Sequence, residues 1–143
     1  DLFAGTGSLG LESVSRGAAL AVFVERDART VGHLKRTITE FAVGDRCRVV
    51  RSDAVRFVSP PHRGREPFDI VFADPPYDTD QARRVHEVLD RWNGIAAGGL
   101  VVIEHRADDR LPERGARLRL RTVKRYGTIE VELHDVIDPG ETQ

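Results

Sequence analysis

An apolar segment, Phe68-Asp69-Ile70-Val71-Phe72-Ala73, leads directly into the turn Asp74-Pro75-Pro76-Tyr77. Five of the six residues in this segment are apolar, which is too many for a strand with one solvent-exposed face. Such runs are typical of central strands in parallel sheets that are covered on both faces. We therefore predict a central strand here, with Asp74 at its carboxyl end, where open α/β sheets place their ligand crevice.

The turn predicts a rigid pair of hydrogen-bond acceptors. Pro75 and Pro76 remove two consecutive backbone donors and fix φ at both positions. The Asp74 carboxylate and the Pro75 carbonyl would then lie beside the ring of Tyr77. This arrangement suits a planar molecule that carries an NH2 group. The alternative is a turn without a ligand, for which aspartate and proline are also typical residues.

Strand-like and helix-like segments alternate along the rest of the chain. We expect strands at 1–3, 20–25, 46–51, 68–73 and 100–104, and helices at 8–16, 28–41, 54–58 and 80–92. This alternation predicts one doubly wound α/β domain over residues 1–143.

The last part of the chain predicts an antiparallel hairpin. Residues 117–122 and 129–134 both alternate between apolar and polar side chains, with Tyr126-Gly127 between them. In the second strand, we expect the apolar side chains to face inward and Glu130, Glu132 and His134 to form the solvent-exposed face.

The composition limits the classes of function. The chain has 143 residues, 40% hydrophobic and 31% charged, as expected for one ordinary globular domain. No apolar run approaches the roughly 20 residues of a membrane span and no signal peptide is visible, so we expect a cytoplasmic protein. Cys47 is the single cysteine and is expected to be a buried thiol. Because His62, His86, His105 and His134 lack a spacing typical of metal ligands, we predict no metal site.

The first residues suggest an incomplete first strand. The chain contains no methionine, and Asp1-Leu2-Phe3 has the character of a strand's end. We therefore expect a fragment whose N-terminal part is missing.

A glycine-rich turn follows this strand end. Gly5-x-Gly7-x-x-Gly10 matches the dinucleotide fingerprint, and Glu25 lies 20 residues after Gly5, at the distance expected for an acid that holds ribose hydroxyls. An NAD-binding fold is therefore one interpretation. However, the carboxylate of Asp1 would repel a pyrophosphate in this loop, whereas it would attract a positively charged ligand.

S-adenosylmethionine carries positive charge at its sulfonium and amino groups, so it fits Asp1 better than NAD does. In this interpretation the loop amides and Asp1 hold the amino-acid end, and Glu25 accepts the ribose hydroxyls. Asp53, at the end of the third predicted strand, would accept a hydrogen bond from the adenine amine. Asp53 is also a plausible helix N-cap for residues 54–58, and the two roles can coexist.

Together these motifs resemble a family. Asp1-Leu2-Phe3-Ala4-Gly5-Thr6-Gly7 with Asp74-Pro75-Pro76-Tyr77 is similar to class I S-adenosylmethionine-dependent methyltransferases that act on an exocyclic amine. Within this class the chain resembles the RsmD-type enzymes, which methylate guanine N2 in bacterial 16S ribosomal RNA. The matching segments are 1–12, 15–18, 22–25, 67–77 and 125–127.

The resemblance implies a Rossmann-like fold, a mostly parallel twisted sheet with helices on both faces and a C-terminal antiparallel hairpin. It also implies S-adenosyl-L-methionine as cofactor and 16S rRNA, in the 30S ribosomal subunit or its assembly intermediate, as partner. Asp74 and the Pro75 carbonyl would orient the amine, and Tyr77 would stack on the flipped base. The Asp-Pro-Pro-Tyr motif is shared with adenine-N6 methyltransferases, which remain the main alternative. The family's N-terminal basic segment is absent from this chain, and Thr128 stands where the family usually has aspartate.

The predicted cofactor-binding residues are Asp1, Phe3, Gly5, Thr6, Gly7, Glu25, Arg26, Asp53, Ala54 and Asp74. The predicted catalytic residues are Asp74, Pro75 and Tyr77. We expect the protein to be a monomer.

RNA contacts are predicted from the charge distribution. Residues 106–125 carry eight basic and three acidic side chains, whereas residues 128–143 carry five acidic ones. A basic stripe of this kind indicates either nucleic-acid binding or a hairpin with cross-strand ion pairs. The RNA-binding candidates are Arg63, Arg65, Arg106 and Arg125, each with the alternative of a solvated arginine.

Overall fold

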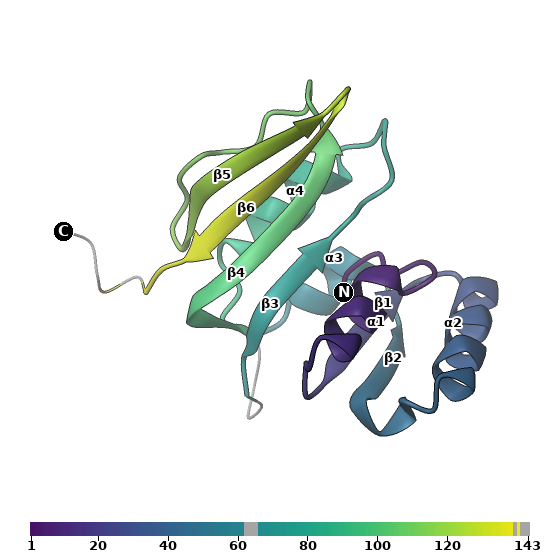
Figure 1. The fold of residues 1–143 in the computed structure, drawn as a ribbon. Coiled ribbons are helices and arrows are strands. Elements are labelled where there is room, and N and C mark those ends of the chain that lie inside the picture. The colour runs from purple at the N-terminus through teal and green to yellow at the C-terminus, as the bar shows by residue number, and fades with distance from the viewer. Residues whose placement is uncertain (62–65, 139, 141–143) are drawn as a thin grey trace. The chain divides into compact units, whose positions relative to one another are not determined.

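A computed structural model describes residues 1–61, 66–138 and 140 (Figure 1). The chain divides into two compact units, Asp1–Phe57 and Val58–Gln143, which we describe one at a time. Within the described residues, no helix combines the length and the apolar character that crossing a membrane requires.

The first unit pairs two parallel strands under two helices. Its elements are α1 (Ser8–Ser15), β1 (Ala21–Glu25), α2 (Ala28–Glu40), the 3-10 helix η1 (Gly44–Arg46) and β2 (Cys47–Arg51). Leu2 forms a parallel bridge with Val24, so the N-terminal segment lies along β1 as a short third strand. The short helix α3 (Ala54–Val58) follows β2 and ends at the first residue of the second unit.

One apolar core joins these elements. Phe23 of β1 is fully buried and packs with Val14 of α1 and with Leu34 and Ile38 of α2. Cys47 packs against the same core and is half-buried, and burial raises the pKa of its thiol. Both helices therefore cover the face of the sheet that carries Phe23.

The predicted helix boundaries of this unit are close to those observed. Asp27 caps α2, because its carboxylate accepts a hydrogen bond from the Thr30 backbone N–H at 2.7 Å. Gly17 ends α1 with φ 103°, the left-handed conformation that glycine adopts most readily. Of the apolar side chains of α1, Val14 is buried and Leu11 packs against the core, whereas Leu9 is 40% exposed.

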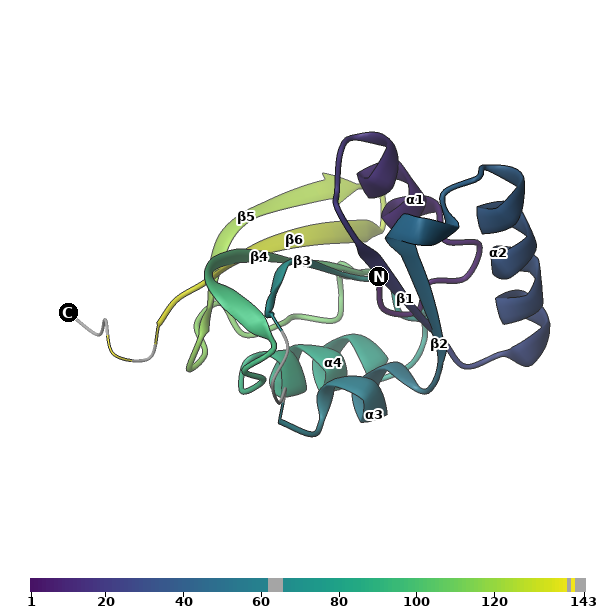
Figure 2. The ribbon, with the colours of Figure 1, turned by 90° about the horizontal axis from the view of Figure 1, so that it is seen from below.

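The described residues of the second unit form a four-stranded sheet with one helix. Its elements are β3 (Phe68–Ala73), α4 (Gln81–Leu89), β4 (Ile95–Arg106), β5 (Leu118–Tyr126) and β6 (Ile129–Val136). The strand order is β3-β4-β6-β5, in which β3 and β4 are parallel and the other two pairs are antiparallel. Helix α4 lies along one face of this sheet (Figure 2). The predicted C-terminal hairpin is therefore confirmed, and β6 inserts between β4 and β5.

Two predictions about burial are wrong. We expected β3 to be covered along both faces, but Asp69 is exposed and Ile70 is 48% exposed. Only the end of the strand that leads to the turn is well buried, at Val71 and Ala73. Among the described strands of the second unit, β3 pairs with β4 and forms one edge of the four-stranded sheet.

The hairpin prediction assigned the wrong face of β6 to solvent. Glu132 and His134 are 5% and 0% exposed, whereas Val131 and Leu133 are only half-buried. The buried polar groups contact one another: Glu132 Oε2 lies 2.8 Å from His134 Nε2 and Oε1 lies 3.3 Å from Nε2 of His105 on β4. The hydrogen bond between Glu132 and His134 offsets part of the cost of burying these groups.

Candidate active site

Three strand ends lie along one edge of the first unit. The segment with Leu2, strand β1 and strand β2 run parallel, so their carboxyl ends share that edge. Glu25 is the last residue of β1, and its backbone carbonyl accepts a hydrogen bond from the Ser52 N–H at 3.1 Å. The glycine loop, Glu25 and the segment before Asp53 are thereby brought together, as the sequence predicted.

The carboxylate of Glu25 fastens the glycine loop. Its Oε2 accepts a hydrogen bond from the Gly5 N–H at 3.0 Å, and its Oε1 accepts one from the Asp27 N–H at 2.9 Å. Each carboxylate oxygen has two lone pairs, so both can still accept a hydroxyl donor. The residue is half-buried, and Arg26 beside it is exposed.

Asp1 occupies the anion position at the start of α1. Its Oδ2 accepts a hydrogen bond from the Gly10 N–H at 3.0 Å, in the first turn of the helix. Helix N-termini attract negative groups, and dinucleotide-binding folds place a pyrophosphate there. Because the protein's own carboxylate already holds this amide, the loop is poorly suited to a pyrophosphate. The geometry thus disfavours the NAD interpretation.

Glycine is needed in the loop for two different reasons. Gly5 and Gly7 have φ angles of 55° and 80°, in the left-handed region, and Phe3 shares this conformation with φ 58°. A Cβ at Gly10 would lie only 2.3 Å from Cε1 of Phe23, so Gly10 permits α1 to approach β1 closely. Thr6, at the tip of the loop, is exposed.

Asp53 caps α3. Its Oδ1 accepts a hydrogen bond from the Arg56 N–H at 2.9 Å, which confirms the capping role considered from the sequence. Ala54, the first residue of the helix, is 4% exposed. The second carboxylate oxygen of Asp53 leaves capacity for a further donor.

The Asp-Pro-Pro-Tyr turn lies in the second unit and directly follows β3. Ala73 pairs with Ile103 of β4, so the residues that follow these two partners emerge at the same edge of the sheet. Asp74 and Tyr77 are exposed and Pro75 is buried. Partial desolvation of the Asp74 carboxyl, and then the negative charge of Glu104, raise its pKa above the ordinary value.

Glu104 of β4 holds Tyr77. The Tyr77 hydroxyl donates a hydrogen bond to Glu104 Oε1. This hydrogen bond is the largest cause that raises the pKa of Tyr77 to about 12, followed by desolvation and the negative charges of Glu104 and Asp74. The aromatic ring at the turn is therefore fixed by a side chain from the neighbouring parallel strand.

Arg106 holds the next residue of the turn. Its Nη1 lies 2.6 Å from Asp78 Oδ1, and Asp78 has a φ of 60°, which non-glycine residues rarely adopt. After it, the Thr79 hydroxyl donates a hydrogen bond to the Pro76 carbonyl at 2.7 Å. Contacts from β4 and within the turn thus fix its C-terminal part.

The four RNA-binding candidates lie in different surroundings. Arg63 and Arg65 are outside the described residues. Arg106 pairs with Asp78, as above, and Arg125 of β5 is exposed, with Nη1 3.8 Å from Glu130 Oε1 on β6. A second cross-strand ion pair joins Arg121 and Asp135, so the hairpin has the ion pairs that the alternative interpretation predicted.

Sequence reasoning missed Glu104 and Asp78 as parts of the site. A signal for Glu104 was available, because it ends a predicted strand as Asp74 does, and the carboxyl ends of neighbouring parallel strands meet. Sequence reasoning also missed the histidine and glutamate cluster around His105, because its members come from three elements and have no regular spacing.

The chain has the α/β architecture of a class I methyltransferase, with a parallel strand pair in each unit and a C-terminal antiparallel hairpin. The crystal structure of HI0767 from Haemophilus influenzae, a protein assigned as a methylase, has a TM-score of 0.88 at 28% identity and covers 96% of this chain and 85% of that one. An RNA methyltransferase from Salinibacter ruber, solved with S-adenosyl-L-homocysteine, has a TM-score of 0.69 over 96% of this chain and 79% of its own. At 16% sequence identity, this structural similarity supports the fold and nothing more.

The chain belongs to the family described as Conserved hypothetical protein 95, whose model matches residues 1–135. Ribosomal RNA small subunit methyltransferase D of Escherichia coli K12 is 32% identical over 142 residues, which are 99% of this chain and 70% of that protein. YlbH of Bacillus subtilis, a protein assigned as an rRNA methyltransferase, is 30% identical over 94% of this chain and 73% of its own length. The resemblance to the RsmD-type family expected from the motifs is confirmed.

Proposed function

We propose that this chain is the catalytic domain of an S-adenosylmethionine-dependent rRNA methyltransferase that methylates the exocyclic N2 amine of a guanine in 16S rRNA. The observation that carries the proposal is the Asp74-Pro75-Pro76-Tyr77 turn, fixed by Glu104 and Arg106 at the carboxyl end of β3. This observation gains its meaning from the family, of which the E. coli relative is a small-subunit rRNA methyltransferase.

The residues of the first unit fit the cofactor. When bound, S-adenosylmethionine supplies an electrophilic methyl group. The acidic side chains Asp1, Glu25 and Asp53 lie on or next to three neighbouring parallel segments, and each retains acceptor capacity after its backbone hydrogen bonds. Glu25 would accept the ribose hydroxyls, Asp53 the adenine amine and Asp1 the positively charged amino-acid end. Phe3, Gly5, Thr6, Gly7, Arg26 and Ala54 complete the proposed binding segments.

Asp74 and Pro75 would act on the amine. The lone pair of an exocyclic purine amine is delocalised into the ring, so the amine is a poor nucleophile. Hydrogen bonds from its two N–H groups to the Asp74 carboxylate and the Pro75 carbonyl would direct the lone pair outward and stabilise the positive charge that develops on nitrogen. Asp74 needs to be an acceptor rather than a strong base, because the amine proton becomes acidic only as the new bond to carbon forms.

Tyr77 would hold the base. An exposed ring of fixed position is a stacking platform, and stacking on an aromatic side chain is worth about 1–3 kcal/mol per base. The hydrogen bond to Glu104 removes much of the ring's rotational freedom before the base arrives. Arg125, which is exposed, remains a candidate for a phosphate contact.

The experiment that tests the proposal identifies the modified nucleoside. The full-length protein and methyl-labelled S-adenosylmethionine are incubated in three separate reactions, with 30S subunits, with free 16S rRNA and with DNA. We expect labelled N2-methylguanosine in 16S rRNA. Labelled N6-methyladenine would instead support the adenine-N6 alternative and overturn the substrate proposed here, and the comparison of subunits with free rRNA defines which form is the substrate.

A further inference from the structure

A cluster of polar side chains is buried between α4 and the sheet of the second unit. His105 of β4 is 1% exposed, and Glu132 and His134 of β6 are 5% and 0% exposed. His86 of α4 is 1% exposed, and its ring contacts that of His134, with ring centres 5.0 Å apart. Buried groups of this kind are costly unless each has a partner. Methyl transfer as proposed above uses none of them.

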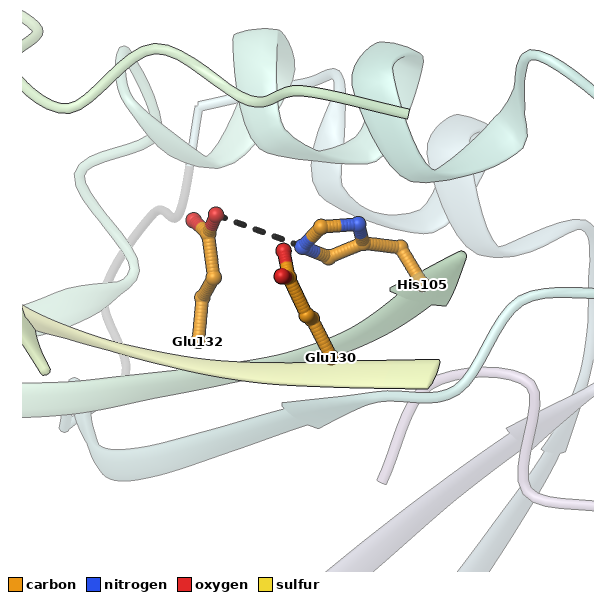
Figure 3. A group of neighbouring side chains, drawn as sticks. All are labelled: His105, Glu130 and Glu132. Atoms are coloured by element: carbon orange, nitrogen blue, oxygen red, sulfur yellow. Dashed lines mark ion pairs between the residues drawn. The ribbon is translucent and has the colours of Figure 1, made fainter. Parts of the chain in front are cut away.

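His105 presents an unshared ring nitrogen to two glutamates. Its Nδ1 lies 2.7 Å from the Arg106 carbonyl, which can only accept, so Nδ1 carries the proton. In the neutral ring, Nε2 is then a lone-pair donor. This atom is buried and has no hydrogen-bond partner among the described residues, although Glu132 Oε1 lies 3.3 Å away. Glu130, the direct cross-strand partner of His105, turns its carboxylate toward the same end of the imidazole ring as Glu132 does (Figure 3).

The spacing of these atoms is that of metal ligands. His105, Glu130 and Glu132 each offer one ligand atom, and these atoms lie within 4.8 Å of one another. Two nitrogen or oxygen ligands at about 2.1 Å from a tetrahedral zinc ion are about 3.4 Å apart. The 3.3 Å between His105 Nε2 and Glu132 Oε1 matches one edge of such a tetrahedron.

The second layer around the cluster is also that of a metal site. Metal-binding histidines commonly donate their other N–H to a carbonyl, as His105 does to Arg106. The outer oxygen of Glu132 lies 2.8 Å from His134 Nε2, and Glu130 lies 3.8 Å from Nη1 of Arg125. All three candidate ligands therefore have a partner that orients them.

We propose that His105, Glu130 and Glu132 form a binding site for a divalent transition-metal ion of the zinc class, which clamps β4 to β6. One such ion would neutralise the two carboxylates and coordinate the imidazole. Imidazole ligation favours zinc-class ions over Mg²⁺ and Ca²⁺, which prefer oxygen ligands. The proposal is the opposite of the expectation drawn from histidine spacing, and it does not depend on the methylation substrate.

The test uses Zn²⁺ and the chelator-treated full-length protein. Calorimetric titration is expected to show one equivalent of bound Zn²⁺, a rise in melting temperature on binding, and no comparable binding of Mg²⁺. Glu130→Gln is the informative variant, because this side chain is 19% exposed and its replacement is the least disruptive of the three. We expect it to weaken binding at least about 100-fold, since even losing a partner in the second layer costs 10–100-fold.

Two control variants separate this site from Zn²⁺ binding elsewhere on the chain. Asp135→Asn removes a carboxylate from the same strand that also pairs with an arginine, and it should leave Zn²⁺ binding unchanged. His33→Ala removes an exposed histidine that could bind the ion adventitiously, and it should also have no effect. Absence of Zn²⁺ binding by the folded protein, or binding that Glu130→Gln leaves intact, would overturn the proposal and leave a proton-mediated histidine–glutamate cluster only.

Discussion

In the first unit, backbone N–H groups hold the site carboxylates, whereas in the second unit side chains of β4 hold the turn that follows β3. Glu25 and Asp1 accept hydrogen bonds from Gly5 and Gly10, so the loop and its acids are fixed together. Tyr77 is instead fixed by the side chain of Glu104, 27 residues along the chain. The difference shows that a compact motif can specify the arrangement in the first unit, whereas the arrangement in the second unit depends on the register of two strands.

The largest effect on methyl transfer is expected from replacing Asp74 in the turn after β3. Asp74→Ala should reduce methyl transfer by about 10²–10³-fold, since it removes a group that would stabilise charge in the transition state. Asp80→Ala, at an exposed position before α4, is the matched control and should retain activity. Single-turnover methylation measures the effect, and calorimetry measures cofactor affinity. If both fell equally, Asp74 would belong to cofactor binding rather than to the amine.

The packing of the first unit can be broken at Gly10. A methyl group there would lie 2.3 Å from the ring of Phe23, which is fully buried and cannot move aside. We expect Gly10→Ala to reduce the free energy of unfolding by about 2–3 kcal/mol, as overpacking of a core does. Gly44→Ala, where a Cβ meets nothing within 4 Å, should change it by less than about 0.5 kcal/mol. Chemical denaturation of both variants provides the measurement, and equal stabilities would contradict the close approach of α1 to β1.

In the second unit, Asp90 ties the end of α4 to the segment before β5. Its carboxylate accepts hydrogen bonds from the backbone N–H groups of Ala116, Arg117 and Leu118, all at 2.8 Å. Burial alone would raise the pKa of Asp90, but these hydrogen bonds lower it below its ordinary value. Asp90→Ala should therefore reduce the free energy of unfolding at neutral pH by about 2 kcal/mol.

The pH dependence of this difference has a defined sign. A lowered pKa means that the folded state favours the carboxylate, so its stabilisation is fully present above the unfolded-state pKa of about 3.9. It is lost as the pH falls through the folded-state pKa. The difference in the free energy of unfolding between the natural protein and Asp90→Ala should hence shrink in acid. Asp108→Ala, at an exposed position, should show no such difference. A gap independent of pH would assign the effect to packing.

The sequence was most informative where the contacts are local. The glycine loop and Glu25 belong to one strand–helix–strand segment, and the 20-residue spacing between Gly5 and Glu25 ends in a direct hydrogen bond at 3.0 Å. The strand that precedes Asp74 was also located correctly from its apolar run. In these cases the periodicity and the spacing reflect contacts within one unit of supersecondary structure.

The inner face of β6 could not be predicted from alternation. A period of two residues separates two faces but does not say which is buried. We assigned burial to the apolar side, but Glu132 and His134 lie inside because His105 of β4 and His86 of α4 are there to receive them. His105 precedes Glu132 by 27 residues, and His86 precedes His134 by 48 residues, so only the tertiary structure reveals these partners.

The smallest expected effect tests how β4 holds the turn. Glu104→Gln removes the charge and the strong acceptor that raise the pKa of Tyr77 to about 12, so this pKa should fall toward its ordinary value. The chain has two tyrosines, and a Tyr126→Phe background leaves Tyr77 as the single phenol for ultraviolet titration. The raised pKa favours the protonated phenol in the folded state. This contribution to stability is present below the ordinary pKa of about 10 and is lost as the pH rises through the folded-state value.

Because Tyr77 is 44% exposed, the change in stability caused by Glu104→Gln should be slight, and methylation should slow only as far as the ring loses its fixed position. A titration of Tyr77 that Glu104→Gln leaves unchanged would show that the turn is fixed by its prolines and by Arg106 alone.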